Sequence, residues 1–206
     1  MTNDDLYVAM GDSTGVGLGA RHGGYPQRLL GRLRTLRPHF RLLNLSQSGA
    51  RSLDVLQDQV PDLLKVRPAL ISLAIGINDV VHGEPEEAFT NNLEEIAVRI
   101  SKLGAPVVLA NIPDIAFAPA VSALVPPSYF ERRIEVLNRH LEATAARHGF
   151  ALVDLYNSSR AALAEHPEYF CGDGFHPSDA GYEAWVEIAW PTVRPLVQPP
   201  DAAALS

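Results

Sequence analysis

The stretch LYVAMGDSTG, residues 6–15, places a serine just beyond a short apolar run. Five consecutive apolar residues, 6–10, followed by Gly11 are typical of a fully buried β-strand, because a half-exposed strand alternates apolar and polar residues. Ligands of parallel α/β folds bind at the carboxyl ends of the strands. Ser13 is therefore the first candidate functional residue.

Four more apolar runs of similar length follow, at residues 41–45, 70–75, 107–111 and 151–155. Between them, apolar residues recur at steps of three and four over residues 53–63, 89–103 and 128–148, and a last helix is expected from about Ser178, with Pro191 interrupting or kinking it. This alternation predicts an α/β protein, a single-domain three-layer α/β/α sandwich around a five-stranded parallel sheet. We expect the domain to span residues 1–197 and residues 198–206 to form a flexible tail.

Composition narrows the classes of function. The 206 residues carry a net charge of -7 without a basic run, which argues against nucleic acid as a partner. No apolar stretch reaches the roughly 20 residues of a membrane span. Cys171 has no second cysteine to pair with, and an acidic start without an apolar segment favours a cytoplasmic protein. The sequence leaves the oligomeric state open.

A second informative stretch is Asp173-Gly174-Phe175-His176. A serine hydroxyl is a weak nucleophile that needs an imidazole to accept its proton and a carboxylate to orient that imidazole. Ser13, His176 and Asp173 fit these three roles. Asn78 and Gly49 follow two other predicted strands and offer a side-chain amide and an unobstructed backbone N–H for a developing oxyanion.

These residues fall in four blocks, and their order resembles the SGNH hydrolases, also called GDSL esterases and lipases. The blocks are Gly11-Asp12-Ser13, residues 44–49 (NLSQSG), residues 76–79 (GIND) and Asp173-Gly174-Phe175-His176, and the resemblance spans about residues 6–190. It implies a flavodoxin-like SGNH hydrolase fold, with Ser13, Asp173 and His176 as a catalytic triad and Ser13, Gly49 and Asn78 as oxyanion donors. Thr14 stands where the GDSL name has Leu, at a position that is not catalytic in the family.

Three other motifs overlap these residues. Residues 11–15 spell G-x-S-x-G, the nucleophile elbow of α/β-hydrolases, but that fold needs several strands before its nucleophile and here there is one. Residues 15–20 match a variant of the dinucleotide fingerprint, but the second strand ends without an acidic residue for a ribose; we interpret residues 15–24 as a flexible loop near the site. The remaining alternative is a metallophosphoesterase that uses Asp12, Asn78, Asp79, Asp173 and His176, although the histidines lack paired metal-binding spacing.

The resemblance implies a serine esterase that needs no cofactor and no metal and acts on small-molecule esters, with short to medium acyl chains. The alternatives are an acyltransferase with the same triad and a non-catalytic binding module on the same fold. Asp12 and Asp79 are expected to bond to loop amides rather than to react, and Cys171 receives no role. Residues 112–129, apolar and Pro-rich, are interpreted either as a wall or lid of the acyl pocket or as a packed connector.

Overall fold

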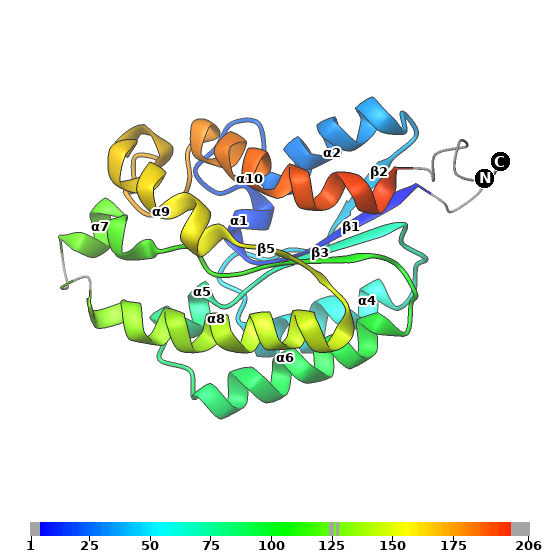
Figure 1. Ribbon diagram of the computed structural model, residues 1–206, viewed down its shortest axis with the longest axis horizontal. Coiled ribbons are helices and arrows are strands. Elements are labelled where there is room, and N and C mark those ends of the chain that lie inside the picture. Colours follow the sequence, from blue (N-terminus) through cyan, green and yellow to red (C-terminus); the bar gives the residue numbers. More distant parts are fainter. Residues whose placement is uncertain (1–4, 124–125, 127, 199–206) are drawn as a thin grey trace.

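The structure, a computed structural model, describes residues 5–123, 126 and 128–198. Five parallel strands form one sheet in the order β2-β1-β3-β4-β5, with helices on both faces (Figure 1). The strands are β1 (Leu6–Gly11), β2 (Arg41–Asn44), β3 (Leu70–Ala74), β4 (Val107–Ala110) and β5 (Ala151–Val153). The predicted three-layer sandwich with a five-stranded parallel sheet is therefore confirmed. Residues 199–206, most of the expected tail, lie outside the described residues.

Alternate residues of each strand pack against the two helical layers. Val8 and Met10 belong to the core under α6 (Glu86–Ser101) and α8 (Ser128–His148). Tyr7 and Ala9 belong to the core under α2 (Tyr25–Leu36) and α10 (Asp179–Val197). All four strand residues are fully buried. This double burial explains why the strands are continuously apolar in the sequence.

The helical run at residues 52–63 is irregular. It consists of α3 (Ser52–Asp54), the π-helical turn η1 (Val55–Gln59) and α4 (Val60–Leu63). Pro61, the second residue after the π turn, has no N–H to donate to the preceding turn, so an unbroken α-helical ladder is impossible there. Periodicity predicted one regular helix, and the proline accounts for the difference.

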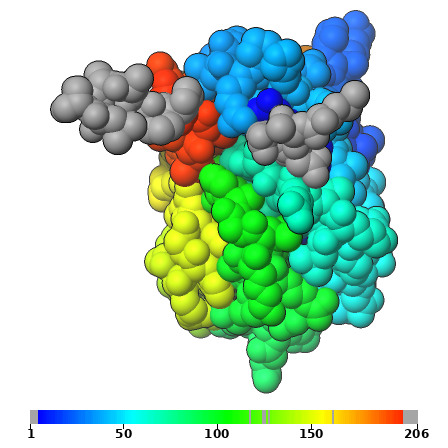
Figure 2. Space-filling model, turned by 90° about the vertical axis from the view of Figure 1, so that its right-hand side faces the viewer, coloured from blue at the N-terminus to red at the C-terminus, as the bar shows by residue number. Residues whose placement is uncertain are grey.

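Every strand ends within two residues of its predicted end, and the last strand differs most. The last strand ends at Val153 rather than at residue 155, because the Asp154 side chain accepts the Asn157 N–H and caps α9 (Leu155–Glu165). Helix α10 continues through Pro191 to Val197, so the proline does not interrupt the helix, which was one of its two predicted effects. Figure 2 shows the end of the molecule at which α10 finishes beside α2.

The remaining short helices gather near the carboxyl ends of the strands (Figure 1). They are α1 (Ser13–Val16), α5 (Ile77–Val81), η2 (Ile115–Phe117), α7 (Pro119–Ser122) and η3 (Pro167–Tyr169). Among the described residues, no helix combines the length and apolar character needed to cross a membrane.

Candidate active site

Ser13 is the first residue of α1, directly after the turn that ends β1. Gly11 makes this turn possible: its φ is +146°, and a Cβ at this position would lie 2.3 Å from the carbonyl oxygen of Ala74 on the neighbouring strand. The N–H groups of a helix's first turn have no intrahelical acceptor. The local fold therefore presents both the hydroxyl and the backbone N–H of Ser13 at the end of the sheet.

Gln59, at the end of η1, binds the backbone of Gly11 at the end of β1. Its Oε1 accepts the Gly11 N–H at 2.8 Å, and its Nε2 donates to the Gly11 carbonyl at 2.7 Å. The Gln59 side chain is 1% exposed and comes from the π turn η1. This pair of buried hydrogen bonds fixes the chain two residues before Ser13.

His176 is carried by a small hairpin between η3 and α10. The Cys171 N–H donates to the His176 carbonyl at 2.8 Å, and Phe170 pairs with Pro177 in an antiparallel bridge. At the tip, Asp173 Oδ1 accepts the backbone N–H groups of Phe175 and His176 at 2.8 and 2.9 Å. The Asp-x-x-His spacing thus lets one carboxylate shape the turn and also reach the imidazole.

The three side chains form a continuous row of hydrogen bonds. His176 Nδ1 lies 2.7 Å from Asp173 Oδ2, and His176 Nε2 lies 3.1 Å from Ser13 Oγ. Partial burial raises the pKa of the Asp173 carboxyl, but the hydrogen bonds from His176 and from the two backbone N–H groups outweigh it, so the pKa lies well below its usual range. Asp173 is therefore ionised where it meets the ring.

Asp12 caps α1 and does not join this row. Its Oδ1 accepts the backbone N–H of Thr14 at 2.9 Å and the Thr14 hydroxyl at 2.8 Å. Burial raises the pKa of the Asp12 carboxyl to about 6, although both hydrogen bonds oppose the rise. The residue that departs from the GDSL name, Thr14, thus supplies the hydroxyl that partners this buried acid.

Asp79 is fully buried and binds the start of α3. It accepts the Ser52 hydroxyl at 2.6 Å and the Ser52 N–H at 3.1 Å. Burial raises the pKa of the Asp79 carboxyl, and the hydrogen bonds from Ser52 oppose that rise. Asp12 and Asp79 both bond to nearby backbone and hydroxyl groups, as a structural role requires.

Asn78 and Gly49 lie beyond the carboxyl ends of the two strands that flank β1: Asn78 in α5, which follows β3, and Gly49 in the turn after β2. The Asn78 Nδ2 donates to the Ala50 carbonyl at 3.0 Å, which ties α5 to the turn after β2. Gly49 is exposed with φ +79°, and a Cβ built on it would meet nothing within 4 Å. Glycine is therefore favoured at position 49 by the left-handed backbone conformation and not by crowding around a side chain.

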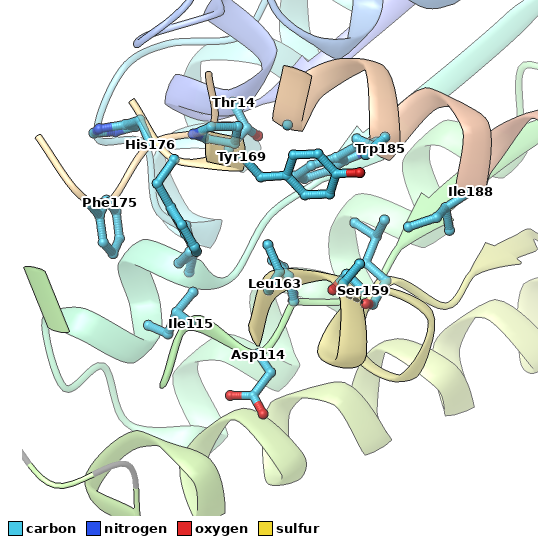
Figure 3. A pocket seen from close by; sticks show the side chains of 18 of the residues that line it. Thr14, Asp114, Ile115, Ser159, Leu163, Tyr169, Phe175, His176, Trp185 and Ile188 are labelled. Atoms are coloured by element: carbon cyan, nitrogen blue, oxygen red, sulfur yellow. Dashed lines mark hydrogen bonds between the residues drawn. The ribbon is translucent and has the colours of Figure 1, made fainter. Parts of the chain in front are cut away.

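An apolar pocket extends from this row into the protein (Figure 3). Ser13, Thr14 and His176 line one end of it, whereas Ile188 lies at the other. The pocket runs between α9 and α10 and has an empty volume of about 760 Å³, part of which is open to solvent.

The segment after β4 contributes Pro113, Asp114 and Ile115 to the wall of this pocket. Figure 3 shows the carboxylate of Asp114 pointing away from the cavity. This carboxylate accepts the Ala116 N–H and lies 3.1 Å from the Arg160 guanidinium. The lining is thus apolar although an acid belongs to it. Residues 124, 125 and 127 of the predicted wall or lid lie outside the described residues.

The glycine-rich loop before α2 is held by α10. The Asp179 carboxylate accepts the backbone N–H groups of Arg21 and His22 and pairs with Arg28. Residues 15 and 16, expected in a flexible loop, instead belong to α1.

Within the described ranges, no cluster of three or more His, Cys, Asp or Glu side chains could hold a metal ion.

Three residues of this region escaped the sequence analysis. Gln59 and Ser52 sit in a helical run whose polar residues read as solvent-facing, and Trp185 reads as one more apolar residue of α10. The signal that could have found Gln59 is Pro61, which breaks the regular helix and so predicts an unusual turn there.

Comparison with known proteins agrees with this architecture. The sequence model of the GDSL-like lipase/acylhydrolase family matches residues 9–184. The chain is 29% identical over 191 residues to "Esterase TesA" of Pseudomonas aeruginosa, covering 92% of this chain and 88% of that protein. A crystal structure of TesA superimposes with a TM-score of 0.75 at 30% identity, over 93% of this chain and 99% of the other.

A more distant likeness concerns the fold alone. Axe2, an acetylxylan esterase from Geobacillus stearothermophilus, matches at 20% identity with a TM-score of 0.68, over 92% of this chain and 94% of the other. The family match covers most of the chain and includes the segments that carry Ser13 and His176. The protein therefore belongs to the GDSL-like lipase/acylhydrolase family and is, with that family, a carboxylic ester hydrolase.

Proposed function

We propose that the protein hydrolyses carboxylic esters with short to medium acyl chains through an acyl-Ser13 intermediate. The observation that carries this proposal is the hydrogen-bonded row from Asp173 through His176 to Ser13, which ends at the mouth of an apolar pocket. A nucleophile with its base is thereby joined to a space suited to an alkyl chain.

In acylation, Ser13 Oγ attacks the ester carbonyl and His176 Nε2 accepts the hydroxyl proton. With its proton on Nδ1, where Asp173 accepts it at 2.7 Å, the imidazole keeps a lone pair on Nε2. The ionised Asp173 then stabilises the imidazolium that forms. His176 passes the proton to the leaving alcohol, and water attacks the acyl-Ser13 with His176 again as base.

The developing oxyanion is assigned three donors: the backbone N–H groups of Ser13 and Gly49 and the side-chain amide of Asn78. An amide nitrogen carries two N–H donors, and the Ala50 carbonyl uses one of those on Asn78. The other is left to the substrate. Removing one such donor typically lowers kcat by about 10² to 10³-fold, so Asn78→Ala is expected to fall in that range.

The acyl chain is assigned to the pocket between α9 and α10. Its apolar lining and its length from His176 to Ile188 favour an alkyl chain over a sugar, although one neighbour is an acetylxylan esterase. Each buried methylene contributes about 0.8 kcal/mol of transfer free energy. We therefore expect kcat/KM to rise with acyl length until the pocket is filled.

The experiment is a rate series on p-nitrophenyl esters from acetyl to decanoyl, with Ser13→Ala as control. We expect wild-type turnover with a maximum beyond acetyl and no turnover above background for Ser13→Ala. Adding alcohols as competing acceptors and analysing the products tells hydrolysis from acyl transfer; ester formation in excess of free acid would favour the transferase alternative.

A second measurement tests the nucleophile directly. A fluorophosphonate should add its phosphonyl mass at Ser13 in the wild type and not in Ser13→Ala. A folded wild type that gains no mass would support the non-catalytic binding module instead.

A further inference from the structure

Trp185 separates the acyl pocket from a second, internal cavity. The second cavity is small, because the centre of a water molecule can reach only about 20 Å³ of it. It lies between the sheet and helices α2 and α10, where Leu29, Val108 and Val193 contribute to its walls. Within the described part of the chain, Trp185 is the one residue that lines both spaces. Its indole ring, labelled in Figure 3 where it borders the acyl pocket, is therefore the partition between them.

The position of Trp185 on α10 explains this double role. Ala184 and Ile188 line the acyl pocket, whereas Ala189 and Val193 line the internal cavity. With 3.6 residues per turn, position 185 falls between these two sets on the helix surface. The side chain at 185 thus stands on the boundary between the two faces.

The indole is held in this position by Tyr25. The two rings stack with centroids 5.2 Å apart and an interplanar angle of 5°. Tyr25 itself lines the internal cavity and is 4% exposed. A stacked ring on a buried neighbour has little freedom to swing aside, so the partition is closed in the resting protein.

The space behind the partition is compatible with an alkyl chain. Its lining is largely aliphatic, with Leu73, Ala74 and Val153 among the contributing strand residues. The Ser72 hydroxyl at its edge is already bonded to the Tyr7 hydroxyl at 2.7 Å. An alkyl chain that entered would therefore leave that hydroxyl with a partner.

We propose that Trp185 sets the upper limit on the length of the acyl chain by closing the acyl pocket off from the internal cavity. This inference rests on the proposed function, in which the pocket holds the acyl group. Replacing the indole with a smaller side chain frees the volume of the ring itself and joins the two spaces, so that longer chains can extend beneath α10. Each additional methylene buried there is expected to raise kcat/KM about fourfold.

The test compares Trp185→Ala with the wild type on p-nitrophenyl esters from butyryl to tetradecanoyl. We expect the optimum to move to a chain at least two carbons longer, with the dodecanoyl-to-hexanoyl ratio of kcat/KM rising by about tenfold or more. Trp190→Ala is the matched control, because Trp190 lies on the same helix and packs against the same core but lines neither cavity. Its chain-length profile should remain that of the wild type.

Trp185→Phe keeps an aromatic ring stacked on Tyr25 and is the variant to test if Trp185→Ala does not fold. It should move the optimum in the same direction by a smaller amount. A chain-length profile unchanged in the folded Trp185 variants, with the wild type active, overturns the inference and leaves the proposed function intact. A folded wild type that neither hydrolyses any ester nor reacts with a fluorophosphonate overturns both.

Discussion

Replacing Gln59 with methionine removes both hydrogen bonds between the Gln59 side chain and the Gly11 backbone, here called the Gln59 clamp, and keeps most of the buried side-chain volume. The Gly11 N–H loses its Gln59 acceptor, and an unsatisfied buried N–H costs about 1 to 3 kcal/mol. The Gly11 carbonyl keeps the Gln47 N–H at 3.1 Å, so losing the second bond costs only about 0.5 to 1.5 kcal/mol. We expect Gln59→Met to lower the free energy of unfolding by about 2 to 4 kcal/mol.

Urea unfolding at neutral pH measures this difference, with the slope against denaturant expected to stay unchanged. Gln57→Met is the matched control: the same substitution two positions away, on an exposed side chain of the same π turn. Its effect should stay within about 0.5 kcal/mol. Esterase kcat should also fall in Gln59→Met, because Gly11 positions Ser13. If both variants unfold at the same urea concentration, the clamp contributes nothing and the reasoning is wrong.

Three further predictions concern charge and protons at the site. Asp173→Asn should lower kcat by about 10² to 10⁴-fold without unfolding the hairpin, because an amide oxygen still accepts the Phe175 and His176 N–H groups but no longer fixes the ring tautomer; kcat within tenfold of wild type would contradict the role of Asp173. Ester hydrolysis should slow on acidification, because a protonated imidazole has no lone pair on Nε2 to accept the Ser13 proton; a rate that acid does not lower would exclude His176 as the base. Burial raises the pKa of the Asp12 carboxyl from 3.8, its ordinary value, to about 6 in the folded protein. The stabilisation of the folded state by this protonated carboxyl is therefore fully present below pH 3.8. As the pH rises through 6 it is lost, which lowers the free energy of unfolding by up to about 3 kcal/mol. Asp12→Asn should therefore flatten the pH dependence of urea unfolding between pH 4 and pH 7, and an unchanged dependence would refute the assignment.

The strands and the hydrogen-bonded pair of Asp173 and His176 were predictable because their signals are local. A doubly covered strand leaves a continuous apolar run, and Asp173 and His176 stand three positions apart in one turn. Ser13 is 163 positions from His176, and its partnership followed from chemistry and from the resemblance, not from spacing.

What the sequence analysis missed depends on tertiary contacts. Helix α2 was overlooked although Pro26 stands at its start and Leu29 and Leu33 share its buried face. The Gln59 clamp and the Trp185 partition cannot be predicted from sequence pattern, because each depends on contact with a residue far away in the chain: Gly11 for Gln59 and Tyr25 for Trp185. The strand end at Val153 was misplaced because Leu155 is apolar, while the cap formed by Asp154 decides the boundary.

The arrangement of the two ends of the fold has a practical consequence for handling the protein. β1 begins and α10 finishes at the same end of the sheet, opposite the end at which α1, α5 and α7 lie (Figure 1). Residues of α1 and α5, namely Ser13, Thr14 and Ile77, line the pocket at that opposite end. A fluorescent protein or a surface anchor fused ahead of β1 or behind α10 would thus sit on the far side of the molecule from the pocket. Immobilised through either point, the molecule would keep its pocket turned toward the bulk solution and open to substrate.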